Sequence, residues 1–202
     1  MIGTSLAYLL KQVNALTVPP QPKTKSAGSA KSAPEEGLVV FPAGTPAGTL
    51  LFPPEKITMV LVNIEEERAQ RNLDQYSHRP IRGKPSQLLK RMPDIRLSLQ
   101  VLFVASFVDY VTAWNQLSEV ISGFQGHPVF SSEHNTDFPA TMEMITTELI
   151  SQSLKEQREL WATLGTSQLP AVLYRFRLLT LRAREETRAG RVESIKTNYI
   201  HQ

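Results

Sequence analysis

The segment from Ile95 to Phe107 constrains the fold more than any other part of the chain. One face of this segment is apolar throughout: Ile95, Leu97, Leu99, Val101, Phe103, Ala105 and Phe107. The other face begins polar, with Arg96, Ser98 and Gln100, and becomes apolar at Leu102 and Val104. An alternation with period two is typical of a β-strand. The pattern predicts a strand that runs from an exposed margin into a core covered on both faces.

Three more segments show a strand pattern. Residues Lys56 to Glu65 are apolar on both faces, which indicates an interior strand, and Met142 to Ile150 indicates another. Ala171 to Leu181 carries Val172, Tyr174, Phe176 and Leu178 on one side and Arg175 and Arg177 on the other. We predict that these segments form one sheet with the first strand.

Three segments have the spacing of amphipathic helices. Met1 to Thr17 carries apolar residues at helical spacing opposite Lys11, Gln12 and Asn14. A second helix is expected to start at Asp109, with a core-facing stripe of Tyr110, Trp114, Leu117, Ile121 and Phe124. A third is expected from Ser153 to Leu164, opened by a capping box and closed by Gly165. We expect Trp114 and Trp161 to pack in the core.

The remaining segments are polar. Residues 18–37 are rich in Pro, Ser, Ala and Lys and indicate an extended linker. Residues 66–90 predict a long loop, or a loop with a short helix, and the chain is polar again from Arg182. We therefore expect an α/β (α+β) fold, a small mixed β-sheet with helices packed mainly on one face. Residues 1–183 are predicted to form a single domain containing the linker, and residues 184–202 a tail or arm.

Several kinds of chemistry lack their usual residue patterns. The chain has no cysteine and no glycine loop for phosphates, and no G-x-S-x-G nucleophile motif is present. His127 and His134 flank a segment with Glu133 and Asp137, but this spacing matches no known metal motif. We predict a non-catalytic protein with no catalytic, cofactor-binding or metal-binding residues, no cofactor and no small-molecule substrate.

Two charged segments are candidate subunit-interface regions. The first contains Glu65, Glu66, Glu67, Arg68, Arg71 and Asn72, and the second contains Arg184, Arg188, Arg191, Tyr199 and Ile200. A helical turn at the first segment would let the arginines neutralise the glutamates. Two stretches of the chain are basic, Arg68 to Arg96 and Arg175 to Lys196. Solvated charge, docking to an acidic protein surface and nucleic-acid binding all remain open for these two stretches. The net charge of +3 and the absence of interleaved aromatic residues make nucleic acid the weakest of these.

The N-terminal segment does not look like a signal peptide, because no basic residue precedes its apolar stretch. No apolar run approaches the ~20 residues that span a bilayer. We therefore expect synthesis in the cytoplasm and no membrane insertion.

Several stretches, in this order, resemble one protein family. They are Ala7–Asn14, Val62–Arg68, Leu99–Phe107, Leu117–Ile121, Phe124–Phe130, Glu159–Trp161 and Leu169–Arg175. Together they are similar to the tail-terminator, or cap, proteins of extracellular contractile injection systems. These systems are phage-tail-like particles of the antifeeding-prophage and Photorhabdus virulence cassette type. The resemblance extends from Met1 to about Leu181 and is expected to weaken in the linker and the tail.

The resemblance implies a structural role in a bacterial particle that is either released or anchored in the cell. It implies a homohexameric ring that binds inner tube and sheath proteins, ends their polymerisation and secures the sheath. An extended linker and tail would be suitable arms for strand addition to a neighbour. Two alternatives remain: another tail or baseplate component, and a basic nucleic-acid-binding protein.

Overall fold

The computed structural model describes most of the chain. The described residues are 2–17, 37–44, 50–67, 76–81, 84–91, 95–133, 135, 137–139, 142, 144–181 and 186–188. The elements are α1 (Ile2–Leu16), β1 (Val39–Val40), β2 (Ala43–Gly44), β3 (Leu50–Leu51), β4 (Lys56–Glu66), β5 (Tyr76–Ile81), β6 (Lys84–Arg91), β7 (Ile95–Ser106), α2 (Tyr110–Gly126), β8 (Val129–Ser131), β9 (Met144–Ile150), α3 (Leu154–Leu164), β10 (Ala171–Leu181) and β11 (Glu186–Arg188). The predicted linker, residues 18–37, lies outside the described residues except for Gly37.

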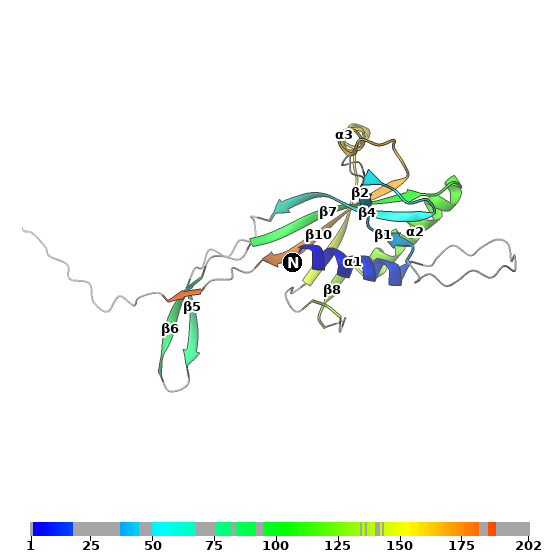
Figure 1. Cartoon of the computed structure of the whole chain (residues 1–202). Helices are drawn as coiled ribbons and strands as arrows, with labels where there is room; N and C mark the ends of the chain where they lie inside the picture. The colour runs from blue at the N-terminus through cyan, green and yellow to red at the C-terminus, as the bar shows by residue number, and fades with distance from the viewer. Residues whose placement is uncertain are drawn as a thin grey trace, which may run out of the picture.

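The main sheet has six strands in the order β1-β4-β7-β10-β9-β8, with β7 and β10 in the middle (Figure 1). β1 pairs with β4 in parallel, and the other neighbours in this sheet are antiparallel, so the sheet is mixed. The predicted α+β fold with a mixed sheet is confirmed. The strands predicted at residues 56–65, 95–107, 142–150 and 171–181 correspond to β4, β7, β9 and β10.

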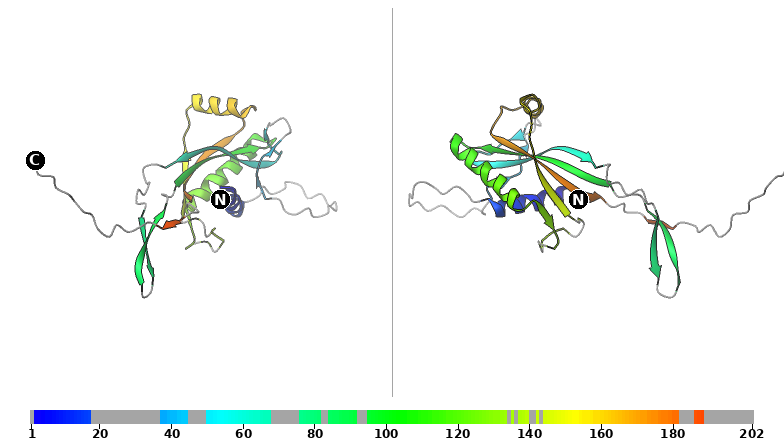
Figure 2. Two further views of the ribbon diagram at one scale, coloured as in Figure 1. Left: turned by 60° about the vertical axis from the view of Figure 1, so that its left-hand side comes forward. Right: turned by 180° about the vertical axis from the view of Figure 1, so that it is seen from behind.

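The two faces of the main sheet carry two separate cores. α1 and α2 cover one face, where Leu9, Phe103 and Phe176 are fully buried (Figure 2). α3 lies over the other face, where Trp161 packs with Val60, Leu102, Val104 and Leu173. The central strand β7 supplies alternate residues to both cores, as its two-sided apolar pattern predicts. Two of the three helices thus lie on one face.

The side chain of Asn14 ties α1 to the edge of the sheet. Its amide nitrogen donates to the carbonyl oxygen of Val39 at 2.8 Å, and its oxygen accepts from the Val39 N–H at 2.8 Å. The side chain thus imitates a neighbouring strand on the outer edge of β1. Gly37 leaves space for it, because a Cβ there would stand 2.3 Å from the Asn14 oxygen.

The caps of α3 follow the prediction from sequence. Ser153 and Glu156 form a capping box at its N-terminus, and Gly165 ends it in the left-handed region with φ 68°. The hydrogen bonds from the backbone N–H and the hydroxyl of Ser153 hold the pKa of the Glu156 carboxyl below its usual value. α3 is amphipathic, but only Trp161 is fully buried along its length.

The stripe predicted for α2 is wrong at its first turn. The buried residues of α2 are Ala113, Gln116, Leu117, Val120 and Phe124. Tyr110 is 65% exposed and Trp114 is 43% exposed, so neither is a core residue. The helix begins four residues after β7 ends. We attribute the exposure of Tyr110 and Trp114 to the position of this end of α2. The helix starts beside the margin of the sheet, so its first residues have little of the sheet to pack against.

The loop predicted for residues 66–90 is also wrong, because this region contains strands β5 and β6. They pair antiparallel, β11 pairs with the other side of β6, and the three strands form a sheet that stands apart from the main sheet (Figures 1 and 2). Ile81, at the end of β5, pairs with Lys84, at the start of β6. The residues of β5 and β6 show no regular alternation of apolar and polar side chains in the sequence.

Candidate interaction surface

Helix α3 covers only part of its face of the main sheet. Beyond the apolar core under α3, this face continues as a polar surface, which we call the polar face. Its residues are Asn63, Glu65, Glu67, Gln100, Glu148, Arg175 and Arg177. A β-bulge between Leu61 and Asn63 shifts the register of β4 and brings Asn63 opposite Gln100.

Ion pairs and hydrogen bonds connect the strands across the polar face. Arg177 is 2.7 Å from a Glu148 oxygen and 3.7 Å from a Glu67 oxygen. Arg175 is 3.6 Å from Glu148. The Glu65 carboxylate accepts from Gln100 at 2.7 Å and from Asn63 at 2.9 Å. Such partly exposed pairs contribute about 0–1 kcal/mol each to stability, so this surface is better suited to orienting a partner than to holding the fold together.

The structure places the predicted interface residues unevenly. Glu65 and Glu67 belong to the polar face, whereas Glu66 pairs with Leu97 and lies on the other face. The chain is extended through Glu66, and Glu67 pairs with Arg177. The helical turn considered for this segment depends on Arg68 and Arg71, which lie outside the described residues. Arg68, Arg71, Asn72, Arg184, Arg191, Tyr199 and Ile200 lie outside the described residues, and the Arg188 side chain is not described although its backbone belongs to β11.

The sequence analysis included Arg175 and Arg177 in a basic stretch but did not select them, or Glu148, as interface residues. The alternation of Arg175 and Arg177 with Tyr174 and Phe176 did place the arginines on one polar side of β10. The pairing of β9 with β10, which brings Glu148 opposite Arg175, has no local signal in the sequence.

The outer edge of β4 is open over most of its length. β1 pairs with β4 only at Ile57 and Thr58, and no other described strand pairs with that edge. From Met59 to Glu66 the backbone therefore presents N–H and C=O groups along this edge. An exposed strand edge is a template for pairing with another chain.

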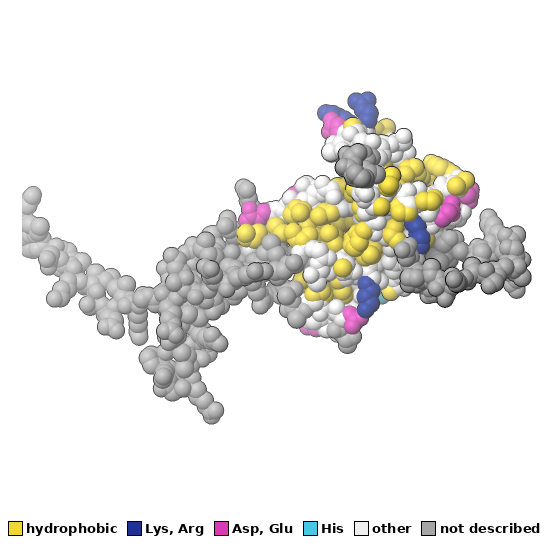
Figure 3. Space-filling model, viewed as in Figure 1, with side chains coloured by type: hydrophobic (Ala, Val, Ile, Leu, Met, Phe, Trp, Pro, Cys, Tyr) yellow, Lys and Arg dark blue, Asp and Glu magenta, His cyan; other side chains and the backbone are white. Residues whose placement is uncertain are grey.

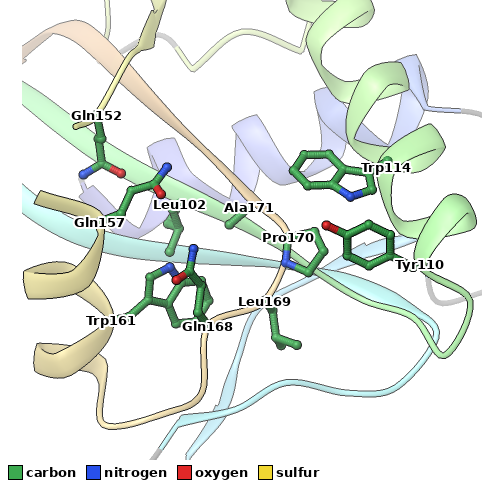
Figure 4. A pocket seen from close by; sticks show the side chains of 10 residues that line it. All are labelled: Leu102, Tyr110, Trp114, Gln152, Gln157, Trp161, Gln168, Leu169, Pro170 and Ala171. Carbon is green, nitrogen blue, oxygen red and sulfur yellow. The ribbon is translucent and has the colours of Figure 1, made fainter. Parts of the chain in front are cut away.

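A pocket of about 340 Å³ lies between the start of α2, α3 and the start of β10 (Figure 4). We call it the aromatic pocket. Its lining residues are Leu102, Tyr110, Trp114, Gln152, Gln157, Trp161, Gln168, Leu169, Pro170 and Ala171. None of these side chains is charged. The sequence did not predict this site, because the spacing of Tyr110 and Trp114 assigned both residues to the core.

The described residues show little that resembles a reaction centre. Among them, no group of three or more His, Asp or Glu side chains is placed to hold a metal ion. Burial raises the pKa of Tyr174 to about 12, so its phenol stays protonated at neutral pH, as a core residue would. Of the helices in the described residues, none combines the length and the apolar character needed to cross a membrane.

Comparison with known proteins relates the chain to one family and one kind of structure. Residues 4–194 match the family described as the Pvc16 N-terminal domain. The solved sheath/tube terminator of a PVC extracellular contractile injection system, in its extended state, is similar with a TM-score of 0.60 and 12% identity, covering 100% of this chain and 64% of that one. The tube-terminating cap of the anti-feeding prophage is similar with a TM-score of 0.52 and 13% identity, covering 98% and 61%. No curated protein sequence matches the chain. The chain therefore spans a little under two thirds of each terminator.

Proposed function

The chain belongs to the family of the Pvc16 N-terminal domain, and from this membership we propose that it is a structural terminator of a contractile injection particle. In this proposal it binds copies of itself and the tube and sheath proteins, ends their polymerisation and secures the sheath. The observation that carries the proposal is the fold, which matches a sheath/tube terminator over the full length of this chain. No bond is made or broken in this role, so we propose no enzymatic activity.

We further propose that the copies form a closed ring, with six subunits as the working number. A ring needs a heterologous contact, in which one surface of a subunit meets a different surface of the next. The open edge of β4, the polar face and the separate sheet of β5, β6 and β11 are three different surfaces that could serve.

Exposed apolar side chains support a protein-binding role. On the side of the molecule shown in Figure 3, hydrophobic side chains gather in a broad band over the described residues, while charged side chains are scattered. Large apolar residues with substantial exposure include Phe41, Leu51, Ile64, Ile95, Val108, Tyr110, Val111, Trp114, Leu149 and Leu154. A gathered apolar surface such as the band in Figure 3 marks interaction sites in soluble proteins.

Deleting the gene should test the terminator role directly. Particles made without the protein are expected to have tubes and sheaths of uncontrolled length, because nothing then stops subunit addition. Negative-stain electron microscopy would measure the length distribution, with the gene restored in trans as the control. A length distribution as narrow as that of the intact particle would contradict the proposal.

The tail provides a second test. We propose that Arg184, Arg188, Arg191, Tyr199 and Ile200 contribute to contacts between subunits. A chain ending at Ala183 is expected to lose ring or particle assembly while its melting temperature stays nearly unchanged. The truncation also removes β11, but β11 pairs only with β6, outside the main sheet. Intact particles, or loss of the main fold by circular dichroism, would contradict the prediction.

The segment from Glu65 to Asn72 provides a third test of the proposed function. We propose that Glu65, Glu66, Glu67, Arg68, Arg71 and Asn72 form ion pairs and polar contacts between subunits. Glu66→Lys and Arg68→Glu should each reduce assembly, because each places like charges across the contact, and the double variant should restore much of it. Pull-down of tagged by untagged subunits would measure this. A double variant as defective as the singles would count against such pairs.

A further inference from the structure

The aromatic pocket has a composition suited to a particular kind of peptide. We propose that it binds the proline-rich segment Val18–Pro22 of a second copy of this chain. This inference rests on the proposed function to the extent that assembly places several copies side by side. It adds a docking site and an occupant to that function.

The pocket has an aromatic wall and a carboxamide wall. Tyr110 and Trp114 form the first, with ring centroids 5.9 Å apart and planes at 78° (Figure 4). Gln152, Gln157 and Gln168 stand on the other side, which is also the side of Trp161 from α3. Within the described part of the chain, these three carboxamides and the Trp114 indole make no side-chain hydrogen bond.

This arrangement fits an uncharged, proline-rich peptide. Proline rings pack against aromatic side chains, and grooves that recognise such peptides are lined by aromatics. Prolines lack an N–H, so the peptide presents mainly carbonyl oxygens, which the carboxamide and indole N–H groups can satisfy. A charged ligand is disfavoured because no lining side chain carries a charge to pair with it.

Exposed apolar residues lie next to the lining residues in the chain, which favours a macromolecule over a small molecule. Val108 is 93% exposed and Val111 is 64% exposed, and both flank Tyr110 in the chain. Leu154, at the start of α3, is also highly exposed. A peptide segment carried by a folded partner would cover this margin as well as the pocket.

The chain itself contains a matching sequence. Val18-Pro19-Pro20-Gln21-Pro22 has three prolines and no charge, and it directly follows the last described residue after α1, Thr17. α1 packs on the sheet face opposite to α3, so the start of the segment and the pocket belong to different sides of one molecule. A contact between them across two copies is heterologous, the kind that a ring requires.

Fluorescence can test the pocket directly, because the chain has only two tryptophans and both line it. A peptide of residues 17–22 with blocked ends, added to the full chain, should shift the tryptophan emission to shorter wavelength and saturate. A peptide with Pro19→Ala, Pro20→Ala and Pro22→Ala should bind at least tenfold more weakly. Tyr110→Ala should weaken binding of the natural peptide at least tenfold with its melting temperature retained, whereas Val129→Ala, exposed on β8, should bind like the wild type.

Mixing two variants can test the contact between copies. A chain with the three proline substitutions keeps the pocket, and a Trp114→Ala chain keeps the segment. In sedimentation velocity each alone should stay monomeric at a concentration where the wild type associates, and the equimolar mixture should form a dimer. Unchanged emission, equal binding of the proline-free peptide, or a mixture that stays monomeric would overturn the proposal. The length assay on particles would decide the terminator role independently.

Discussion

Phe103→Ala is expected to lower the free energy of unfolding by about 3–5 kcal/mol, the range for removing a buried phenylalanine side chain. Phe103 is fully buried at the centre of the six-stranded sheet. Its ring lies 5.7 Å from Phe124, 6.0 Å from Tyr174 and 6.4 Å from Phe176, measured between centroids. The substitution leaves a cavity between three rings that strand β10 and helix α2 hold in place, so the surroundings cannot easily collapse into it.

Equilibrium unfolding in urea would measure this loss. The matched control is Val108→Ala, just beyond the end of the same strand, where the side chain is 93% exposed and the change should be within about 0.5 kcal/mol. A loss below about 1 kcal/mol for Phe103→Ala would mean that the core under α2 is not close-packed.

The regular part of the main sheet could be predicted from the sequence because the order of apolar and polar residues along each strand follows the burial of its two faces. β7 alternates apolar and polar residues and then becomes apolar on both faces, since it passes from the polar face to the region under α3. α3 could be predicted with its boundaries because Ser153, Glu156 and Gly165 act within one or two turns of the helix.

The errors occurred where local pattern and burial are not linked. β5 and β6 pair through their backbones, and their sequence carries no alternation of apolar and polar residues from which the pairing could be predicted. Tyr110 and Trp114 continue the helical spacing of α2, but burial depends on where the helix lies relative to the margin of the sheet. Neither strand order nor helix placement can be read from a window of ten residues.

The candidate surface could be predicted only in part for the same reason. The acidic run Glu65–Glu67 stood out in the sequence, but its partner Arg177 comes from β10, about a hundred positions later. The aromatic pocket combines the start of α2 with α3 and β10, and it exists because these elements meet at one end of the sheet. Pairs and pockets of this kind depend on the topology of the fold. The sequence therefore indicated individual residues but not which residues lie next to them in space.

Trp161→Ala is the second substitution with a large expected effect, about 3–5 kcal/mol lost from the free energy of unfolding. Trp161 is 6% exposed and is the only fully buried residue of α3. It packs edge-on against Phe52, with centroids 6.3 Å apart, and covers Val60, Leu102, Val104 and Leu173 of the sheet. Leu160 and Leu164 of α3 also pack against this cluster but are only partly buried, so the helix should lose most of its attachment.

Hydrogen exchange would show where the loss occurs. If α3 docks through Trp161, amides of residues 157–164 in the variant should exchange much faster, while those of β7 should change only in proportion to global stability. Leu154→Ala on the same helix, where the side chain is 85% exposed, should alter neither measurement appreciably. If α3 stayed protected in the Trp161→Ala variant, contacts other than the indole would hold it. In that case Trp161 would be chiefly a wall of the aromatic pocket, a residue whose burial serves binding more than folding.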